Sequence, residues 1–509
     1  MGARRVRARE VRTLAHEVDT RATTTGRRFD RGVAEAEPQY APEARSDHLP
    51  PMEYKDMPEP LPLRRVLGPS VILAGVGVGS GEYILWPYIS ANAGIGFLYL
   101  AVVGVTIQYF LNMEIERYTL ATGETAIAGF ARSWKPWGIL FCVFAIVPNI
   151  WPGWGTAGAT TFSYLVGGNP NVIAMIVLLA IGVALTTSPV VYKALEGAEF
   201  FKVGLTIVFL IVAIFAAISL SDWGGLGDNV SNFGTLPTDD VAISTLLAGL
   251  VFAGAGGANN LVQSNWIREK GFGMGAYVPK IESPVTGAPE PAPTTGTMVR
   301  QDEENLNRFH RWFKVANKEQ LVSFWAICLA SIIVFSVLAF ATVYGKNISD
   351  EADFDFIKGE GEVLKDVVGP WFGTFFWIFG SISLVLVALG VVDYVARLSA
   401  DVLKTLHLRD NERWSESKIY ACIVWTMCLL GIAVLAAGFD QPLVLLVLSA
   451  CLNGIVMFIY SILLIKLNRS GLPHAIRIRG MRLGVLGFAV LFYGFFAGWY
   501  VIVQLGEIF

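Results

Sequence analysis

The chain has 509 residues, of which 54% are hydrophobic and only 16% are charged. Soluble domains usually carry about 25% charged residues, so this composition excludes an ordinary soluble protein and indicates many passages through a lipid bilayer. The net charge of −3 is uninformative by itself, and we expect no nucleic-acid partner. The five cysteines all lie in apolar segments without metal-ligand spacing, and we interpret them as packing residues.

Residues 1–63 are polar and rich in Arg, Glu, Thr and Pro. They contain no apolar core of a signal peptide, so we expect no cleavable leader. We interpret them as a disordered cytoplasmic tail that precedes a membrane domain over residues 64–505. A Pro- and Thr-rich stretch within residues 268–318 predicts a flexible cytoplasmic linker. At its end, Asn305–Lys318 has aromatic residues at helical spacing and is a candidate amphipathic surface helix.

Apolar windows of about 20 residues mark membrane helices. The sequence predicts an all-α integral membrane protein with eleven such spans, at 66–88, 95–117, 137–161, 171–190, 195–220, 242–266, 319–344, 371–397, 418–438, 442–466 and 482–505. Basic residues gather in alternate loops, including Lys193 and Lys202 in the turn between spans four and five. Because basic loops stay in the cytoplasm, we expect a cytoplasmic N-terminus and an outer C-terminus. We also expect a location in a prokaryotic inner (plasma) membrane.

The first span contains the stretch GVGVGSGE, which ends at Glu82. Glycine costs about 1 kcal/mol relative to alanine inside a helix, and a charge at membrane depth costs about 3 kcal/mol or more. Irregular backbone is tolerated there only when protein buries it or it lines a cavity. The first span is therefore predicted to be a broken helix that forms a binding site around Gly79, Ser80, Gly81 and Glu82.

The sixth span repeats this pattern, with glycines followed at once by amide side chains. Spans one and six are five helices apart, which is where an inverted five-plus-five repeat places its two broken helices. We expect the second half of the site at Gly257, Ala258, Asn259, Asn260 and Gln263. Close packing by small residues is the competing explanation for the glycines, but it does not explain Glu82 or the paired asparagines.

Other polar residues lie at membrane depth. Asp393 and Arg397 are spaced for an ion pair within one helix, and we favour a structural or inner-gate role for them. Asn149 and Asn453 are expected to bond neighbouring helices. All five histidines lie outside the spans, and we expect no cofactor.

Four stretches resemble the Nramp family of divalent-metal transporters, which have the LeuT-type fold. They are GPSVILAGVGVGSGEY, QYFLNMEIERYTLATGETAIAGFAR, FAIVPNIWPGWGTAGAT and VYKALEGAEFFKVGL, and span six is similar around Asn260-Leu261. The resemblance covers about residues 64–505, and eleven spans is the usual prokaryotic number in that family. It implies a LeuT-like five-plus-five repeat with helices 1 and 6 broken, and secondary transport of a metal ion by symport.

The site residues depart from that family. Its Asp-Pro-Gly-Asn motif reads here as Gly79-Ser80-Gly81-Glu82, and its Met-Pro-His motif falls on Gly257-Ala258-Asn259. Its acidic proton-path residues in helix three fall on Asn149 and Pro152. Loss of the thioether weakens selectivity for soft metals, and loss of the helix-three acids breaks that proton route. Glu82 remains as a residue that can take up a proton itself, and Glu82 with Asn260 is the candidate metal pair.

We therefore expect a secondary transporter of a small cation, such as a divalent metal ion, with altered selectivity and weakened or absent proton coupling. Two alternatives stay open. One is a transporter on the same scaffold for a small organic solute, an amine or amino acid, in room left by the small residues at both breaks. The other is a sensor that transports nothing. The sequence contains no catalytic triad, zinc motif or P-loop, so we do not expect an enzyme. The lipid bilayer and the transported substrate are the expected partners.

Overall fold

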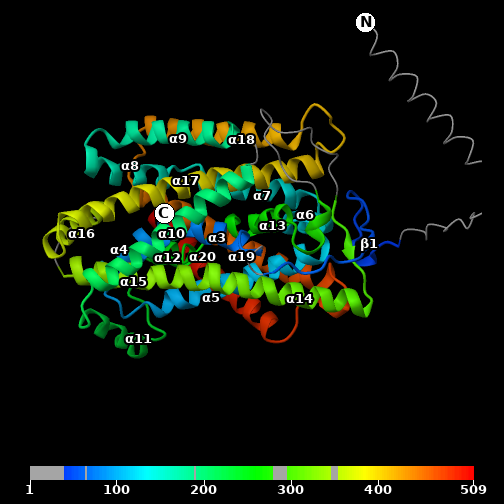
Figure 1. Cartoon of the computed structure of the whole chain (residues 1–509), viewed down its shortest axis with the longest axis horizontal. Coiled ribbons are helices and arrows are strands. Elements are labelled where there is room, and N and C mark those ends of the chain that lie inside the picture. Colours follow the sequence, from blue (N-terminus) through cyan, green and yellow to red (C-terminus); the bar gives the residue numbers. More distant parts are fainter. Residues whose placement is uncertain (1–38, 63–65, 188–190, 279–294, 346–353, 509) are drawn as a thin grey trace, which may run out of the picture. The chain divides into compact units, whose positions relative to one another are not determined.

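The computed structural model describes residues 39–62, 66–187, 191–278, 295–345 and 354–508 (Figure 1). The chain divides into two units, Met1–Gln39 and Tyr40–Phe509, and the fold below is that of the second unit. The greater part of the predicted tail, residues 1–38, and the Pro-rich stretch 279–294 lie outside the described residues.

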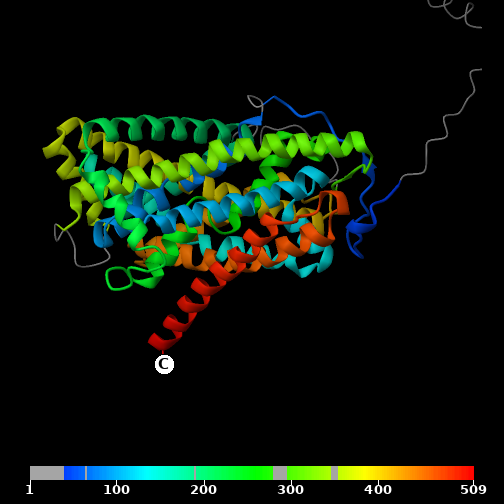
Figure 2. The ribbon, with the colours of Figure 1, turned by 90° about the horizontal axis from the view of Figure 1, so that it is seen from below.

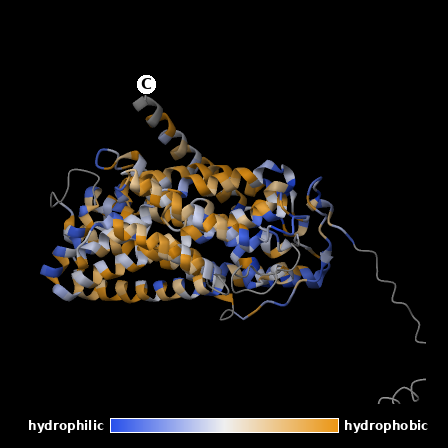
Figure 3. Ribbon diagram, turned by 90° about the horizontal axis from the view of Figure 1, so that it is seen from above, coloured by the Kyte–Doolittle hydropathy of each residue, from blue (hydrophilic) through white to orange (hydrophobic). Residues whose placement is uncertain are grey.

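The described residues form an all-α membrane protein. Eight of its helical segments are long and apolar enough to cross a bilayer. They are α7–α8 (Pro136–Asn149 and Gly153–Val166), α9 (Pro170–Thr187), α10 (Val191–Ala216), α14–α15 (Glu303–Gln320 and Ala326–Val343), α17 (Pro370–Leu406), α18 (Glu416–Ala436), α19 (Pro442–Ser470) and α20 (Met481–Ile508). Figure 3 shows hydrophobic residues along the middle of these helices and hydrophilic residues gathered toward both ends. Figure 2 shows α20 leaning away from the other helices toward its C-terminal end.

The other three predicted spans form different kinds of element. Span one is divided into α3 (Pro69–Gly77), the π-helical turn η2 (Ser80–Leu85) and α4 (Trp86–Ala93). Span six is divided into α12 (Ile243–Val251) and α13 (Ala258–Lys270). Span two is the unbroken helix α5 (Tyr99–Thr122), whose second half carries buried polar and charged side chains. Spans one and six consist of segments that are short for crossing a bilayer, and span two carries buried polar and charged residues. For these reasons the three spans are not among the eight long apolar helices.

Residues 303–320 do not form a separate helix on the membrane surface. Instead, α14 continues through the π-helical turn η5 (Leu321–Trp325) into α15. Its aromatic residues Phe309 and Trp312 are buried in the protein, and the Trp312 indole donates a hydrogen bond to the Pro58 carbonyl at 2.8 Å. Helical spacing predicted the helix correctly, but its apolar face covers protein rather than lipid.

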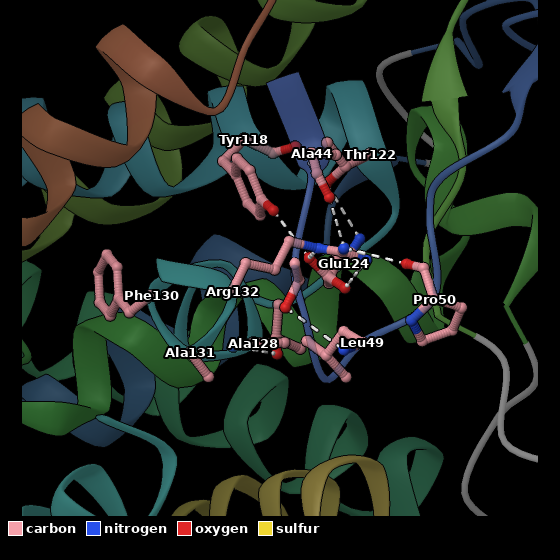
Figure 4. A network of polar contacts seen from close by, with 12 residues as sticks. Ala44, Leu49, Pro50, Tyr118, Thr122, Glu124, Ala128, Phe130, Ala131 and Arg132 are labelled. Carbon is pink, nitrogen blue, oxygen red and sulfur yellow. Dashed lines mark hydrogen bonds and ion pairs between the residues drawn. The ribbon is translucent and has the colours of Figure 1, made fainter. Parts of the chain in front are cut away.

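The structure of this unit begins before residue 64. Strand β1 (Tyr54–Lys55) pairs in parallel with β2 (Met298–Val299), which precedes α14. Figure 4 shows Arg132, on the short helix α6 (Ala126–Ser133), holding the same N-terminal segment. The Arg132 guanidinium donates to the carbonyls of Ala44 at 2.7 Å and Pro50 at 3.0 Å and pairs with Glu124 at 2.8 Å. Residues 40–57 therefore belong to the folded unit, although the sequence placed them in the tail.

Candidate functional site

The first helix is interrupted where its glycines gather. After α3 ends at Gly77, Val78 has extended backbone angles, and the chain re-enters a helix only at Ser80. Gly81 makes the closest approach in this region: a Cβ atom there would overlap the carbonyl oxygen of Phe252. Only glycine fits this contact, so residue 81 must be glycine for the first span to lie this close to Phe252.

The sixth helix is interrupted over residues 252–257. Gly254, Gly256 and Gly257 have φ angles of 117°, 65° and 63°, which are natural for glycine and unfavourable for other residues. Gln108 of α5 bridges the gap, because its amide donates to the Val251 carbonyl at 2.8 Å and accepts from the Gly256 N–H at 3.0 Å. Interrupted backbone must find such partners in a membrane.

The two breaks cross in direct contact. A Cβ atom on Gly77 would lie 2.9 Å from the carbonyl carbon and oxygen of Gly254. A Cβ atom on Gly79 would lie 2.6 Å from the side chain of Val387, and one on Gly257 would overlap the side chain of Asn453. The small residues therefore bring backbones together. At these glycines themselves, neighbouring atoms fill the space that a side chain would take.

Glu82 lies just after the first break and is fully buried. Neither of its carboxylate oxygens has a hydrogen-bond partner among the described residues. The ionisable groups that act on it are the ammonium group of Lys202 on α10 and the thiol of Cys328 on α15. A buried carboxylate with so little hydrogen bonding is costly, and ionisable residues in such places within membrane spans are expected to be functional.

Lys202 joins the first break to α10. Its buried ammonium group donates to the carbonyl oxygen of Gly75, in the last turn of α3. Glu199 lies one turn earlier on α10, and its Oε2 occupies the place that a Gly75 Cβ would take. We call Glu82, Glu199, Lys202 and Cys328 the Glu82–Lys202 cluster. Its ammonium group stands at the negative end of a half-helix, where a cation is favoured.

The amide residues of α13 have other neighbours. Asn260 donates to Asn112 Oδ1 of α5 at 2.6 Å, while its own Oδ1 and that of Asn259 are buried without partners in the described part of the chain. Gln263 donates to Glu116 Oε1 and Gln320 Oε1, both at 2.7 Å. Glu82 and Asn260, the candidate metal pair, thus contact different helices. Ser80 is buried within η2, and Ala258 opens α13, where its N–H donates to Asn453 Oδ1 at 3.4 Å.

The C-terminal parts of α13 and α17 are joined by buried ion pairs. Arg397 pairs with Asp393 at 2.9 Å, as their spacing allows, and also with Glu269 of α13. One turn further along α17, Asp401 pairs with Arg268 of α13 at 2.6 Å. Nearer the break, Asn453 donates to Asn149 at 3.4 Å, so these two amides bond each other across helices. The Arg397 and Arg268 pairs hold the second half of the broken sixth helix against α17.

Sequence reasoning missed Lys202, Glu199, Cys328 and Gln108 as members of the site. Lys202 was assigned to a cytoplasmic turn, which is wrong, because its side chain is fully buried within α10. The available signal was that Glu199 and Lys202 fall inside the predicted span 195–220, where charges are costly and functional. No three His, Cys, Asp or Glu side chains in the described ranges are grouped to hold a metal ion.

No family model and no curated protein matches the sequence. Solved structures do match. The manganese transporter of Eremococcus coleocola, in a point-mutant form, superposes with a TM-score of 0.64 at 10% identity over 87% of this chain and 88% of that one. The same transporter bound to an aromatic bis-isothiourea compound gives 0.63 at 11% identity over 87% and 88%. Mhp1, a nucleobase-cation-symport-1 family transporter with bromovinylhydantoin bound, gives 0.51 at 13% identity over 87% and 94%.

These similarities establish the fold. The chain is an all-α integral membrane protein of the LeuT type, and the helices that such a five-plus-five repeat interrupts are the two that are broken here.

Proposed function

We propose that this protein is a secondary transporter, a divergent relative of the Nramp family, that moves a small cation past the crossing of its two broken helices. The resemblance of four sequence stretches and the fold shared with a manganese transporter support this proposal. The observation that carries it is Glu82, a fully buried carboxylate without a hydrogen-bond partner in the described residues, beside the first break.

The charge of the cluster favours a particular kind of cation. When a bound cation holds Glu82 and Glu199 in their ionised forms, these two carboxylates and the ammonium group of Lys202 leave one unmatched negative charge. A cation with a single positive charge balances it, whereas a bare divalent ion would leave an excess positive charge in a medium where charge is costly. Lys202 also already binds the backbone carbonyl of Gly75, so this oxygen is not free to bind an ion. We therefore favour a monovalent cation, inorganic or a small protonated amine, over Mn²⁺ or Mg²⁺.

Lys202 also offers a reason why the site lacks some of the acidic side chains of the Nramp family. Its ammonium group is a resident cation at the end of α3, so that half-helix needs no bound ion to neutralise its terminal carbonyls. On the inner side, Asp393 and Arg397 with their partners form a gate that must separate before a substrate can pass between α13 and α17. The cytoplasmic N-terminus and the prokaryotic plasma membrane remain predictions.

Uptake by purified protein in liposomes tests this proposal. Radiolabelled Na⁺, methylammonium and Mn²⁺ are offered in turn, and the wild type is compared with Glu82→Gln and with Glu362→Gln, whose side chain is 54% exposed. We expect uptake of a monovalent probe that Glu82→Gln abolishes and Glu362→Gln preserves. Uptake of Mn²⁺ alone would overturn the monovalent assignment. Equal uptake by Glu82→Gln and the wild type would overturn the site.

A further inference from the structure

Glu360, like Glu82 and Glu199, is a buried carboxylate without a hydrogen-bond partner among the described residues, and the site described above does not use it. It lies on α16 (Asp355–Val367), between α15 and α17 in the chain, at the opposite end of the helices from β1 (Figure 1). Its side chain is 1% exposed, and neither oxygen has a hydrogen-bond partner in the part of the chain that the structure describes. An ionised carboxylate in such a place is strongly unfavourable, so the buried form is expected to carry a proton.

Helix α16 is fixed to both the first and the eighth span. The ring of Phe356 packs edge-on against Tyr88 of α4 with a centroid separation of 5.5 Å. The Ile357 carbonyl accepts a hydrogen bond from the Trp377 indole of α17 at 3.2 Å. Glu360 lies one turn after these two anchors and acts electrostatically on the hydroxyl group of Tyr83, the residue that follows Glu82. Helix α16 therefore packs against the half of the first span that follows its break.

The charged groups around Glu360 are engaged elsewhere. On its own helix, Lys365 pairs with Glu362 at 3.2 Å and lies 3.9 Å from the Trp377 ring centroid. Lys358 lies 5.9 Å from the ring centroid of Tyr164 on α8. From the neighbouring helices, the titratable groups that face this region are the hydroxyls of Tyr83 and Tyr164. No cation in the described ranges therefore compensates an ionised Glu360.

We propose that Glu360 is a proton-binding site that keeps α16 closed over the outer approach to Glu82, and that loss of this proton releases α16. The statement that α16 covers a route for the substrate rests on the function proposed above. The closing action itself rests only on the burial of Glu360 and on the contacts of α16.

The direction of the pH dependence follows from linkage. Burial raises the pKa of Glu360 from 4.5 to about 8. In an open form, where the carboxyl group meets water, the pKa returns toward 4.5. Between these values the closed form holds a proton that the open form has released, so rising pH destabilises the closed form relative to the open one. The effect is at most about tenfold per pH unit across this window and stops above about pH 8.

Hydrogen–deuterium exchange of the full chain in lipid nanodiscs tests this inference without any transport assay. Peptides that cover α16 are followed at pH 6, 7, 8 and 9 in the wild type, in Glu360→Gln and in the control Glu362→Gln. Glu360→Gln cannot ionise, so comparison at each pH removes the intrinsic pH dependence of exchange. We expect the excess exchange of the wild type over Glu360→Gln to rise by up to about tenfold per unit up to pH 8 and then level off. Glu362→Gln should follow the wild type.

Identical exchange of α16 in the wild type and Glu360→Gln at every pH would overturn the inference. If Glu360→Gln does not fold, the exchange of α16 in the wild type is normalised to that of α19, and a pH-independent ratio would overturn it equally. A pH-dependent α16 in a protein that shows no cation uptake would leave the proton site standing and remove the transport proposal, so the two failures are distinguishable.

Discussion

The ammonium group of Lys202 donates a hydrogen bond to the carbonyl oxygen of Gly75, and this bond links α10 to the end of the first half-helix. Both groups are buried at membrane depth, where an unpaired ammonium or carbonyl is costly. The same ammonium group balances part of the charge of Glu82 and Glu199. One side chain thus both satisfies the interrupted backbone and sets the net charge of the candidate site.

Replacement of Lys202 should show how strongly the stability of the protein depends on its ammonium group. We expect Lys202→Met to destabilise the protein by about 3–5 kcal/mol, since loss of one partner leaves buried charge without compensation. Adding Glu199→Gln should recover a large part of that loss. Thermal unfolding of the two single variants and the double variant measures this coupling. Additive losses would show that the two side chains do not interact.

The bridge across the sixth-helix break gives a second prediction. Gln108→Leu removes a donor from Val251 and an acceptor from Gly256, and each buried group left unsatisfied costs about 1–3 kcal/mol. Its unfolding midpoint should fall well below that of Gln441→Leu, which changes an exposed glutamine. Equal midpoints would mean that water or another side chain replaces Gln108.

The contact between the two breaks predicts the effect of a single methyl group. Gly81→Ala places a Cβ atom where the Phe252 carbonyl lies, so the helices must separate, at a cost of about 1–3 kcal/mol or more. Gly487→Ala is the matched control, because no atom lies within 4 Å of its added carbon. That control should be neutral or stabilising by up to about 1 kcal/mol. Expression and thermal stability of both variants check the prediction, which fails if Gly81→Ala behaves like the control.

The buried ion pairs between α13 and α17 should differ in strength from pairs at the surface. Arg397→Gln leaves Asp393 and Glu269 buried without their guanidinium, and we expect a loss of about 3–5 kcal/mol. Arg300→Gln breaks a pair with Asp56 in which both side chains are more than half exposed, and should cost about 0–1 kcal/mol. Denaturation of both variants provides the comparison, and a small loss in Arg397→Gln would argue against a buried gate.

The sequence predicted the positions of the two breaks because their cause is local. Clustered glycines, followed by Glu82 or by Asn259 and Asn260, cannot form an ordinary apolar helix, and the chain is interrupted at both places. The partners of the breaks come from distant segments: Lys202 lies 127 residues from Gly75, and Gln108 lies 148 residues from Gly256. No local pattern specifies which distant side chain fills a gap.

Charge distribution alone misplaced one basic residue. Lys202 was counted as a cytoplasmic loop charge, yet it is buried within α10 and hydrogen-bonded to the backbone carbonyl of Gly75. No sequence feature singled out Glu360, because the segment around it is rich in charged residues. Only packing distinguishes buried Glu360 from exposed Glu362. The count of eleven spans remains a prediction, since three of them do not form long apolar helices.

Cation binding at Glu82 is the central claim, and thermal stabilisation of the purified protein tests it most directly. Na⁺, methylammonium, Mn²⁺ and Mg²⁺ are titrated separately into the wild type, Glu82→Gln and Glu362→Gln at constant ionic strength. The account predicts that a monovalent cation raises the unfolding midpoint of the wild type and of Glu362→Gln, and leaves Glu82→Gln unchanged. Equal stabilisation of Glu82→Gln, or stabilisation by divalent ions alone, would contradict it.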